Sequence, residues 1–504
     1  MAQKILNAPS DFSKASQTLE VSRPKARIDW KRVSYLVLGM AVFLAVYYMP
    51  GLPDAVDPSG VRFPLTREGK GALAVLLMGV IWWFFEVMPA GVTGLIMGSA
   101  QALLHIRDAK RVFSDYMDPA VVFIFAAIVM GMVFAGTGLT RRIAYKILSI
   151  IGENTIVIYG GTFFLMAFLS HFMSNTSSAA AIFPLIWAIY SLYRREDIPT
   201  RFGKGLFMGM AFSAGAGSMF TLFSAPRAIL SIAIFKEVAG RDISFAGYSK
   251  YMSLIGWIAV IVIWVFAVVF FRPNRKSLSG LSDRFKELYA ELGPLSRKET
   301  LTIIIMTAVV SLLIISSYIP TLRTPDKAAM ILISTAMIYM FKLMEVKHLE
   351  DVPWNIVLFF GGAMSIGYCL WDTGVSAWLG VRCVGIFAGV HWFAFLIVLA
   401  VVVFIISNVL TNAVAVVLAL PVGLVMSRYV GVTPEVVLFS ISVASAMPFL
   451  LIKSSASNAI AFESKQFTAR EFFTKGILLS VILFVILAVA IWIIWPALGM
   501  PIRN

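Results

Sequence analysis

Long apolar segments separated by short polar ones run through almost the whole chain. Each apolar segment of roughly 17–25 residues predicts a helix that crosses a bilayer, because a helix of that length matches the hydrocarbon thickness. About eleven segments qualify by this criterion. They are residues 33–49, 72–88, 91–106, 119–139, 205–235, 252–271, 301–318, 328–343, 354–378, 434–462 and 476–496. The pattern predicts an all-α integral membrane protein.

Two further apolar segments, residues 155–190 and 391–427, are too long for a single crossing. A polar cluster interrupts each of them, Ser174-Asn175-Thr176 in the first and Thr411-Asn412-Ala413 in the second. A polar tip at membrane depth is tolerated only where protein buries it or water lines it. We therefore expect two re-entrant hairpins, which enter the membrane, break at the cluster and leave on the same side.

The two halves of the chain carry matching landmarks. Each half has an Asn, a Pro nine positions after it and a Gly 37 or 38 positions before it: Gly138, Asn175 and Pro184, then Gly374, Asn412 and Pro421. An odd number of expected crossings separates the hairpins, which inverts the second repeat. We predict an inverted-topology repeat whose first hairpin opens inward and second outward. Their tips would meet near the midplane, where such repeats form a solute site.

The distribution of basic residues defines further parts of the chain. The net charge is +15, and the basic residues gather between apolar segments, where they act as topology signals rather than as a nucleic-acid surface. Residues 1–32 read as a basic cytosolic tail that lacks the apolar core of a signal peptide. Residues 33–271 and 301–504 form the two halves, and 272–300 predict an amphipathic cytoplasmic connector. We expect a multi-pass protein of the inner (plasma) membrane with a cytoplasmic N-terminus.

Composition excludes several function classes. The chain is 59% hydrophobic and 14% charged, with two Cys and four His that form no metal-ligand spacing. No nucleotide-phosphate loop or nucleophile elbow occurs, so we expect neither a primary pump nor an enzyme, and no organic cofactor. Glu86, before Pro89, is interpreted as the partner of a structural ion pair near the membrane surface rather than as a proton carrier.

The polar clusters are the candidate site. Hydroxyl and amide groups offer neutral oxygens to a small cation and donors to an anion. The second cluster contains Ser407, Asn408, Thr411 and Asn412. Each hairpin precedes a segment that Gly, Ser or Pro interrupts, 215–227 and 453–458, which indicates unwound helix. Arg227 and Lys453 lie there, and a cation at such a place is expected to face a cavity or a partner. Either could neutralise an anionic substrate.

At these residues the chain resembles the divalent anion/sodium symporter (DASS) family of di- and tricarboxylate and sulfate carriers. Residues 86–93 are similar to the family's acidic-Pro-x-x-x-Thr segment, and residues 354–362 to its Trp-x-x-x-x-Phe-x-Gly-Gly span. Ser174-Asn175-Thr176 matches its first Ser-Asn-Thr motif. The resemblance covers nearly all of the chain beyond the N-terminal tail.

The resemblance implies a homodimeric elevator with sodium as coupling ion. Substrate contacts would fall on Ser174, Asn175, Thr176, Thr411, Asn412 and Ser455. Lys453 and Arg227, which we assign from the residues themselves, would offset substrate charge. The first sodium site would use Ser170, Ser174, Asn175 and the backbone near Ser224. The second would use Ser407, Leu410, Asn412 and Ser454.

The chain also departs from the family pattern. Thr411-Asn412-Ala413 replaces the second Ser-Asn-Thr, and the Gly-Thr/Ser-Pro-Pro-Asn tails appear as residues 224–228 and 454–458. Lys453 could replace the second bound cation. A carrier with such a built-in charge could need fewer sodium ions, use protons or exchange anions.

The sequence thus favours a secondary-active carrier of a small anion held between two hairpin tips. Two alternatives within transport stay open: a sodium-independent anion exchanger, and a cation/proton antiporter. The antiporter would need carboxylates at the midplane, and neither hairpin has any. A membrane-embedded enzyme would need an acid, base or metal constellation that the sequence does not show.

Overall fold

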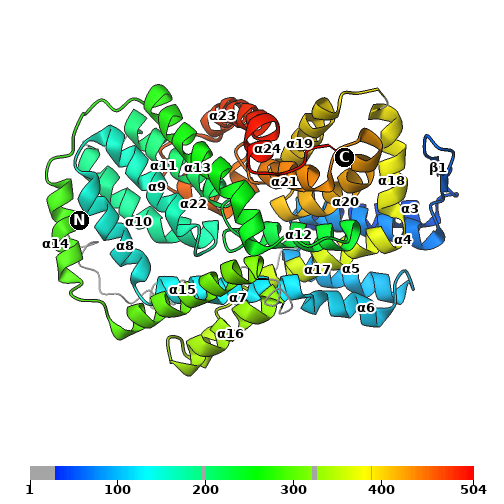
Figure 1. Cartoon of the computed structure of the whole chain (residues 1–504), viewed down its shortest axis with the longest axis horizontal. Coiled ribbons are helices and arrows are strands. Elements are labelled where there is room, and N and C mark those ends of the chain that lie inside the picture. Colours follow the sequence, from blue (N-terminus) through cyan, green and yellow to red (C-terminus); the bar gives the residue numbers. More distant parts are fainter. Residues whose placement is uncertain (1–28, 195–198, 320–325, 388, 504) are drawn as a thin grey trace.

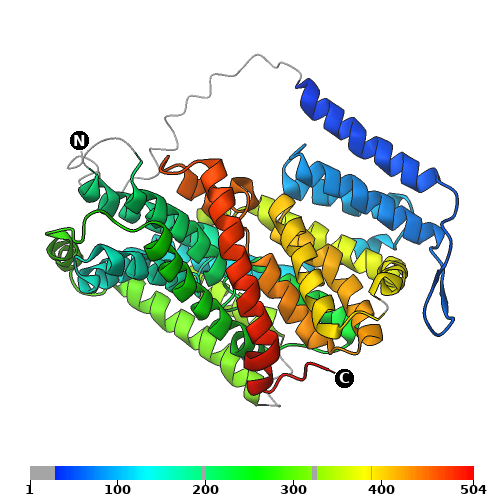
Figure 2. The same ribbon diagram turned by 90° about the horizontal axis from the view of Figure 1, so that it is seen from above.

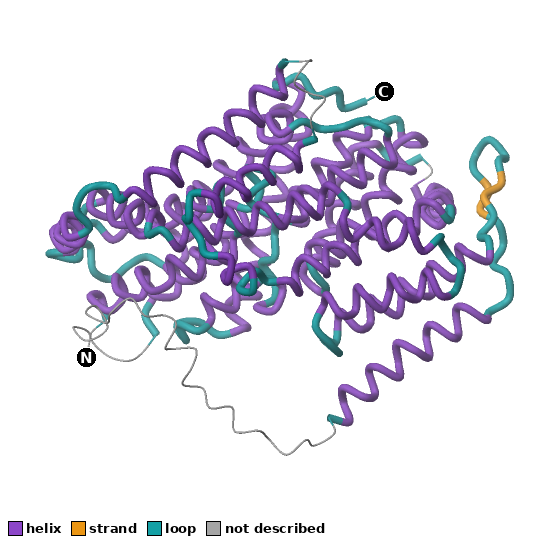
Figure 3. Tube along the Cα trace, turned by 90° about the horizontal axis from the view of Figure 1, so that it is seen from below, coloured by secondary structure: helices purple, strands orange, loops and turns teal. Residues whose placement is uncertain are grey.

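The computed structural model describes residues 29–194, 199–319, 326–387 and 389–503, and helices account for most of this part of the chain (Figure 1). Nine helices of the described residues are long and apolar enough to cross a membrane. A small antiparallel ribbon pairs β1 (Ala55–Val56) with β2 (Arg62–Phe63), and Figure 3 shows it at the margin of the molecule. The all-α membrane fold is confirmed. The count of eleven crossings and the inverted relation of the halves stay predictions.

The N-terminal part consists of α3 (Trp30–Tyr48), α4 (Arg67–Phe84), α5 (Ala90–Leu103) and α6 (Ala109–Ser114). Helix α3 runs along α4 at the edge of the molecule (Figure 2). An added Cβ at Gly39 would lie 2.3 Å from Nε1 of Trp82, so the close approach requires glycine. The same Nε1 donates a hydrogen bond of 3.2 Å to the Leu36 carbonyl oxygen, which fixes the crossing point.

Two units of similar construction follow. The first contains α7 (Pro119–Gly136), α8 (Leu139–Ile151), α9 (Thr155–Leu169), α10 (Asn175–Tyr193), α11 (Arg201–Gly217), α12 (Pro226–Ala239) and α13 (Phe245–Phe270). The second contains α17 (Trp354–Asp372), α18 (Val375–Val384), α19 (Trp392–Val409), α20 (Asn412–Val430), α21 (Pro434–Ser445), α22 (Ala456–Phe462), α23 (Ala469–Val489) and α24 (Trp495–Ala497).

The units match landmark by landmark. Gly138 (φ 89°) and Gly374 (φ 74°) occupy the left-handed region at the N-caps of α8 and α18, a conformation that glycine adopts without strain. The second helix of each hairpin begins at the repeated Asn, and its repeated Pro lies inside the helix. The expected crossings 205–235 and 434–462 are each two helices separated by non-α-helical backbone, residues 218–225 (break 1) and 446–455 (break 2).

The units also exchange packing partners. Helix α10 of the first hairpin packs against α22 of the second unit, and α20 of the second hairpin packs against α12 of the first (Figure 1). Each hairpin thus leans on the helix that follows the other unit's break. The two hairpins and the two broken helices are therefore interlocked rather than laid side by side.

Helix α8 is absent from the sequence-based expectation, which placed no element between the crossing 119–139 and the hairpin 155–190. It is too short to cross a membrane and is amphipathic, so a search for long apolar segments misses it. The connector helix α14 (Leu281–Glu291) packs against α8 at one end of the molecule (Figure 1). The side chain of Arg142 is buried there and its Nε lies 2.7 Å from Oε1 of Glu299. Glu299 belongs to α15 (Arg297–Tyr318), which α16 (Lys327–Met340) follows.

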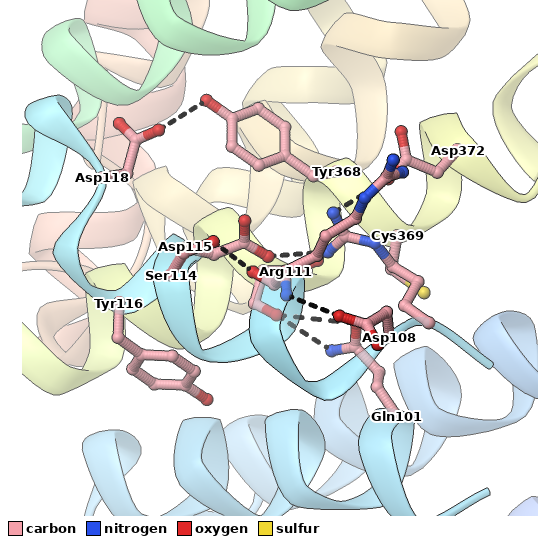
Figure 4. A network of polar contacts seen from close by, with 12 residues as sticks. Gln101, Asp108, Arg111, Ser114, Asp115, Tyr116, Asp118, Tyr368, Cys369 and Asp372 are labelled. Atoms are coloured by element: carbon pink, nitrogen blue, oxygen red, sulfur yellow. Dashed lines mark hydrogen bonds and ion pairs between the residues drawn. The ribbon is translucent and has the colours of Figure 1, made fainter. Parts of the chain in front are cut away.

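A buried polar network joins α17 to the N-terminal part. Nη1 of Arg107 lies 2.6 Å from a carboxylate oxygen of Asp115, and Nη2 lies 2.8 Å from one of Asp372. Nearby, the Tyr368 hydroxyl donates to Asp118 at 3.1 Å (Figure 4). Arg107 lies between two expected crossings, but its charge is neutralised by these carboxylates inside the protein.

Candidate functional site

The first hairpin tip lies between α9 and α10. Ser174 caps α10: its Oγ accepts a hydrogen bond of 3.2 Å from the Ser177 backbone N–H. The Asn175 Oδ1 accepts one of 2.9 Å from the Thr176 N–H. Ser170 is fully buried and its Oγ donates to the Met166 carbonyl at 2.9 Å. The tip therefore gathers hydroxyl and amide oxygens around the start of a helix, where backbone N–H groups favour negative charge.

Break 1 is hydrogen-bonded to this tip. Oγ1 of Thr221 donates to the His171 carbonyl at 3.2 Å, and the Thr221 N–H donates to Oγ of Ser224 at 3.1 Å. An added Cβ at Gly217 would lie 2.9 Å from the Cβ of Ser170, so the end of α11 presses directly on the tip. The expected cation ligands Ser170 and Ser224 thus belong to two segments that touch.

The second tip is clamped to break 2 in a similar way. Oγ of Ser407 lies 3.1 Å both from Oδ1 of Asn412 and from the Ser445 carbonyl oxygen. Thr411 caps α20 by accepting the Val414 N–H at 3.3 Å. The sequence placed Asn408 in the second polar cluster without a role of its own, and in the structure it joins the tip to break 2. Its Nδ2 donates to the Met447 carbonyl oxygen at 2.9 Å. The cost of burying an Asn in an apolar helix was the signal that could have identified it.

The end of α11, just before break 1, packs against break 2. An added Cβ at Gly215, near the end of α11, would lie 3.0 Å from the Ala446 carbonyl oxygen. The rings of Phe212 and Phe449 contact each other at 5.1 Å between centroids. Contacts therefore run from the first tip through the end of α11 and break 2 to the second tip.

Arg227 and Asn458 make similar hydrogen bonds to the backbone of the two breaks. Nη2 of Arg227 donates to the Ser218 carbonyl at 3.0 Å, nine positions earlier. Nδ2 of Asn458 donates to the Leu451 carbonyl at 3.1 Å and also to the Pro448 carbonyl, ten positions earlier. Both side chains bind carbonyl oxygens that the unwound backbone leaves free. Arg227 is buried and points into the break.

Ser454 and Ser455 lie at the end of break 2. Oγ of Ser454 donates to carbonyl oxygens of the break, that of Leu451 at 2.6 Å and that of Pro448 at 3.1 Å. Oγ of Ser455 lies 2.8 Å from Oγ of Ser457. Each hydroxyl keeps lone pairs that could face a cation or a substrate.

A cavity of about 490 Å³ borders the second tip. Its wall combines three N-terminal elements with α17, the tip and break 2: Arg32, Trp83, Phe84, Glu86, Val87, Met88, Pro89, Ala90, Phe359, Val409, Leu410, Thr411 and Lys453. Of the expected site residues, Leu410, Thr411 and Lys453 line it, whereas the first tip, Arg227 and Asn412 do not. The sequence did not point to Arg32 as a wall residue.

Two segments that carry the family resemblance pack together beside this cavity. Oδ1 of Asn355 accepts a hydrogen bond of 2.8 Å from the Gly91 N–H. An added Cβ at Gly362 would lie 2.4 Å from the Cα of Gly94, so the backbones of α5 and α17 touch. Small residues allow such close helix packing.

The oxygens expected to hold sodium fit that role chemically. They are neutral hydroxyl, amide and carbonyl oxygens next to unwound backbone, the donor set that transporters offer to Na⁺. Groups of three or more His, Cys, Asp or Glu side chains able to hold a metal do not occur in the described ranges.

Comparison with known proteins extends these findings. A family model described as "Sodium:sulfate symporter transmembrane region" matches residues 30–501. A sodium-dependent dicarboxylate transporter, SdcS, of Staphylococcus saprophyticus is 23% identical over 468 residues, which cover 87% of this chain and 89% of that protein. SdcS of Staphylococcus aureus is 25% identical over 466 residues, with the same coverage.

Two solved structures share the fold. MtrF of Neisseria gonorrhoeae superposes with a TM-score of 0.55 over 94% of this chain and 96% of that chain, at 12% identity. The YdaH transporter of Alcanivorax borkumensis also gives 0.55, over 94% and 99%, at 12% identity. At this identity the likeness concerns the fold alone.

Proposed function

This chain belongs to the sodium:sulfate symporter family of membrane transporters, which are not enzymes, and on that premise we propose that it moves a small anion across the membrane by secondary active transport. The substrate class is a di- or tricarboxylate, sulfate or a related anion, and sodium is the coupling ion. The observation that carries the proposal is the continuous contact from one hairpin tip through the end of α11 and break 2 to the other tip. Through such contacts, a cation bound at one tip can change the positions of the groups that bind the anion at the other tip.

The substrate would lie against both tips. Ser174, Asn175 and Thr176 supply donors from the first tip, while Thr411, Asn412 and Ser455 supply them from the second side. Lys453 offsets the anion's charge, since its ammonium group lines the cavity beside the second tip. We assign Arg227 a supporting role, in which its buried charge holds break 1 in place and adds positive potential from within.

We assign the first sodium ion to Ser170, Ser174 and Asn175 at the first tip, with the backbone near Ser224. Ser407, Asn412 and Ser454 would form the corresponding group at the second tip. Lys453 makes a second sodium ion less favourable there, because like charges repel strongly where the effective dielectric constant is low. Reciprocal linkage requires that sodium binding raise anion affinity by the same factor by which the anion raises sodium affinity.

An elevator motion would carry the site. The interlocked hairpins and broken helices share α10–α22 and α12–α20 contacts, which favours their moving as one body. Helices α3, α4, α5 and α17 would form the static frame, and a homodimer would anchor it. The N-terminus would lie in the cytoplasm of a cell whose plasma membrane holds the protein.

A sodium-independent exchanger is the second candidate. The observation that favours it is Lys453, whose ammonium group rests 4.4 Å above the Phe84 ring without an acidic partner among the described residues. A bare charge is costly to move through low dielectric, so the carrier would return only with an anion bound.

Transport into vesicles that contain the purified protein separates these candidates. We expect uptake of labelled succinate or sulfate to follow an imposed sodium gradient and to stop when choline replaces sodium. Counterflow that persists without sodium, driven by unlabelled anion inside, would instead establish exchange. Absence of both fluxes for both anions would reject anion transport of these classes.

Asn175→Ala tests the first tip. We expect it to abolish the thermal stabilisation that succinate or sulfate gives in sodium, because ligands that bind only the folded state raise apparent stability. The control is Asn154→Ala, which removes the exposed N-cap of α9, the other helix of this hairpin, at the end away from the tip. Full anion stabilisation in Asn175→Ala would reject this tip as part of the site.

A further inference from the structure

Three charged side chains from three elements line the cavity beside the second tip. Arg32 comes from the first turn of α3, Glu86 from the turn between α4 and α5, and Lys453 from break 2. Within the described part of the chain, these three side chains form no ion pair within 4.0 Å, either with one another or with any other residue. The interpretation of Glu86 as half of a structural ion pair therefore finds no described cation to support it.

The two cations are held by contacts other than carboxylates. Nζ of Lys453 lies 4.4 Å from the centroid of the Phe84 ring, an arrangement that stabilises a cation without neutralising it. Nε of Arg32 donates to the Val87 carbonyl oxygen at 2.5 Å, which fixes the guanidinium against the turn. Its terminal nitrogens make no hydrogen bond within the described part of the chain, so positive charge stays available to a ligand in the cavity.

Glu86 is held at the same wall by unusual backbone geometry. Its φ of 50° lies in the left-handed region, which is uncommon for a residue with a side chain. The neighbouring Val87 N–H closes the turn by donating to the Trp82 carbonyl at 3.0 Å. Because Glu86 follows Phe84 by two positions, the ring beneath Lys453 and this carboxylate belong to one turn. The turn thus places a negative group at the edge of a positively charged site.

We propose that Glu86 sets the charge selectivity of the anion site, by opposing doubly charged anions more strongly than singly charged ones. The inference rests on the proposed function, since it concerns the anion that Lys453 attracts. A fixed carboxylate repels a dianion with about twice the energy with which it repels a monoanion at the same place. Arg32 and Lys453 attract the anion, and Glu86 limits the negative charge of the anion that the cavity binds.

Matched pairs of anions test this directly. Succinate and succinamate are nearly isosteric and differ by one negative charge, as do sulfate and methanesulfonate. The measurement is the concentration of each anion that gives half-maximal thermal stabilisation of the purified protein at neutral pH in sodium. We expect Glu86→Gln to improve binding of the dianion relative to its monoanion by about threefold to tenfold, from the Coulomb energy at partly hydrated separations.

Three further variants make the result specific. Glu86→Asp keeps the charge and should keep a dianion-to-monoanion ratio close to that of the wild type. Lys453→Met should move the ratio in the opposite direction from Glu86→Gln. Glu463→Gln removes an exposed carboxylate at the end of α22, outside the cavity wall, and should leave the ratio unchanged.

The outcomes separate the inference from its premise. An unchanged ratio in Glu86→Gln, with anions still binding, overturns the charge-selectivity role and leaves the proposed transport function intact. Failure of all four anions to stabilise the wild-type protein overturns the anion site itself and this inference with it.

Discussion

The carboxamide oxygen of Asn408 accepts a hydrogen bond of 2.8 Å from the backbone N–H of Leu450, across 42 positions of the chain. On the other side of the same carboxamide, Nδ2 donates to the carbonyl oxygen of Met447. One fully enclosed side chain thus satisfies two backbone groups that break 2 leaves unpaired. The second hairpin tip and the broken helix α21–α22 are thereby tied into one unit.

Asn408→Leu should destabilise the folded protein, because it leaves both backbone groups buried without partners. Each such group costs about 1–3 kcal/mol. We expect a lower Tm in detergent, with or without added anion. The control is Asn154→Ala, whose lost helix cap costs only about 1 kcal/mol. A Tm equal to that of the wild type would contradict the clamp.

Lys453→Met should weaken anion binding while the fold stays intact, because the methionine side chain can still pack on the Phe84 ring. The loss of a charge-assisted contact predicts roughly tenfold or weaker affinity for succinate or sulfate. Lys475→Met is a matched control: Nζ of Lys475 rests 4.5 Å from the centroid of the Phe270 ring, away from the cavity. Equal losses in the two variants would show that the effect is structural rather than electrostatic.

Ser170→Ala should raise the sodium concentration needed for half-maximal anion stabilisation by several-fold or more, since it removes one of the proposed cation ligands. Ser480→Ala provides the matched control, because its Oγ also donates to the carbonyl four residues earlier, at 2.7 Å, and is buried in α23. Both variants lose the same kind of hydrogen bond. Identical sodium dependence in the two would remove Ser170 from the cation site.

Arg142→Met should destabilise the contact between the connector and α8. It leaves the carboxylate of Glu299 buried without its partner, which costs about 3–5 kcal/mol. The double variant Arg142→Met/Glu299→Gln should recover part of the lost Tm, because no buried charge then remains. Arg141→Met changes the exposed neighbour and should have little effect. No recovery in the double variant would show that packing, rather than charge, holds this contact.

The positions of the elements could be predicted well from the sequence. The expected crossing 301–318 lies within α15, and the hairpin tips begin new helices at the two repeated Asn residues, because apolar length and helix-capping chemistry are local properties. The interruptions before α12 and α22 were likewise visible as small and polar residues. Helix α8 was missed because it is short and amphipathic, and α18 was not separated from the expected crossing 354–378 because it is short and apolar.

The partners of the polar groups could not be predicted in the same way. Arg107 lies between two expected crossings, and only the folded structure shows that Asp115 and Asp372 pair with it. The sequence suggested that Arg227 offsets substrate charge, but it could not show that the guanidinium also binds the Ser218 carbonyl in break 1. Both assignments depend on residues that lie far away in the sequence or on a backbone turn that no local pattern specifies.

The amino-acid sequence alone determined that this is an apolar helical chain with duplicated polar interruptions, because hydrophobic length and the cost of burying Asn act on each segment separately. Tertiary structure decided which elements lie together. Helix α10 packs on α22, and α12 packs on α20. Lys453 lines the same cavity as Arg32 and Glu86. Those pairings depend on how the broken helices pack against one another. The energy of each contact depends on distance and burial, and both are defined only in the folded chain.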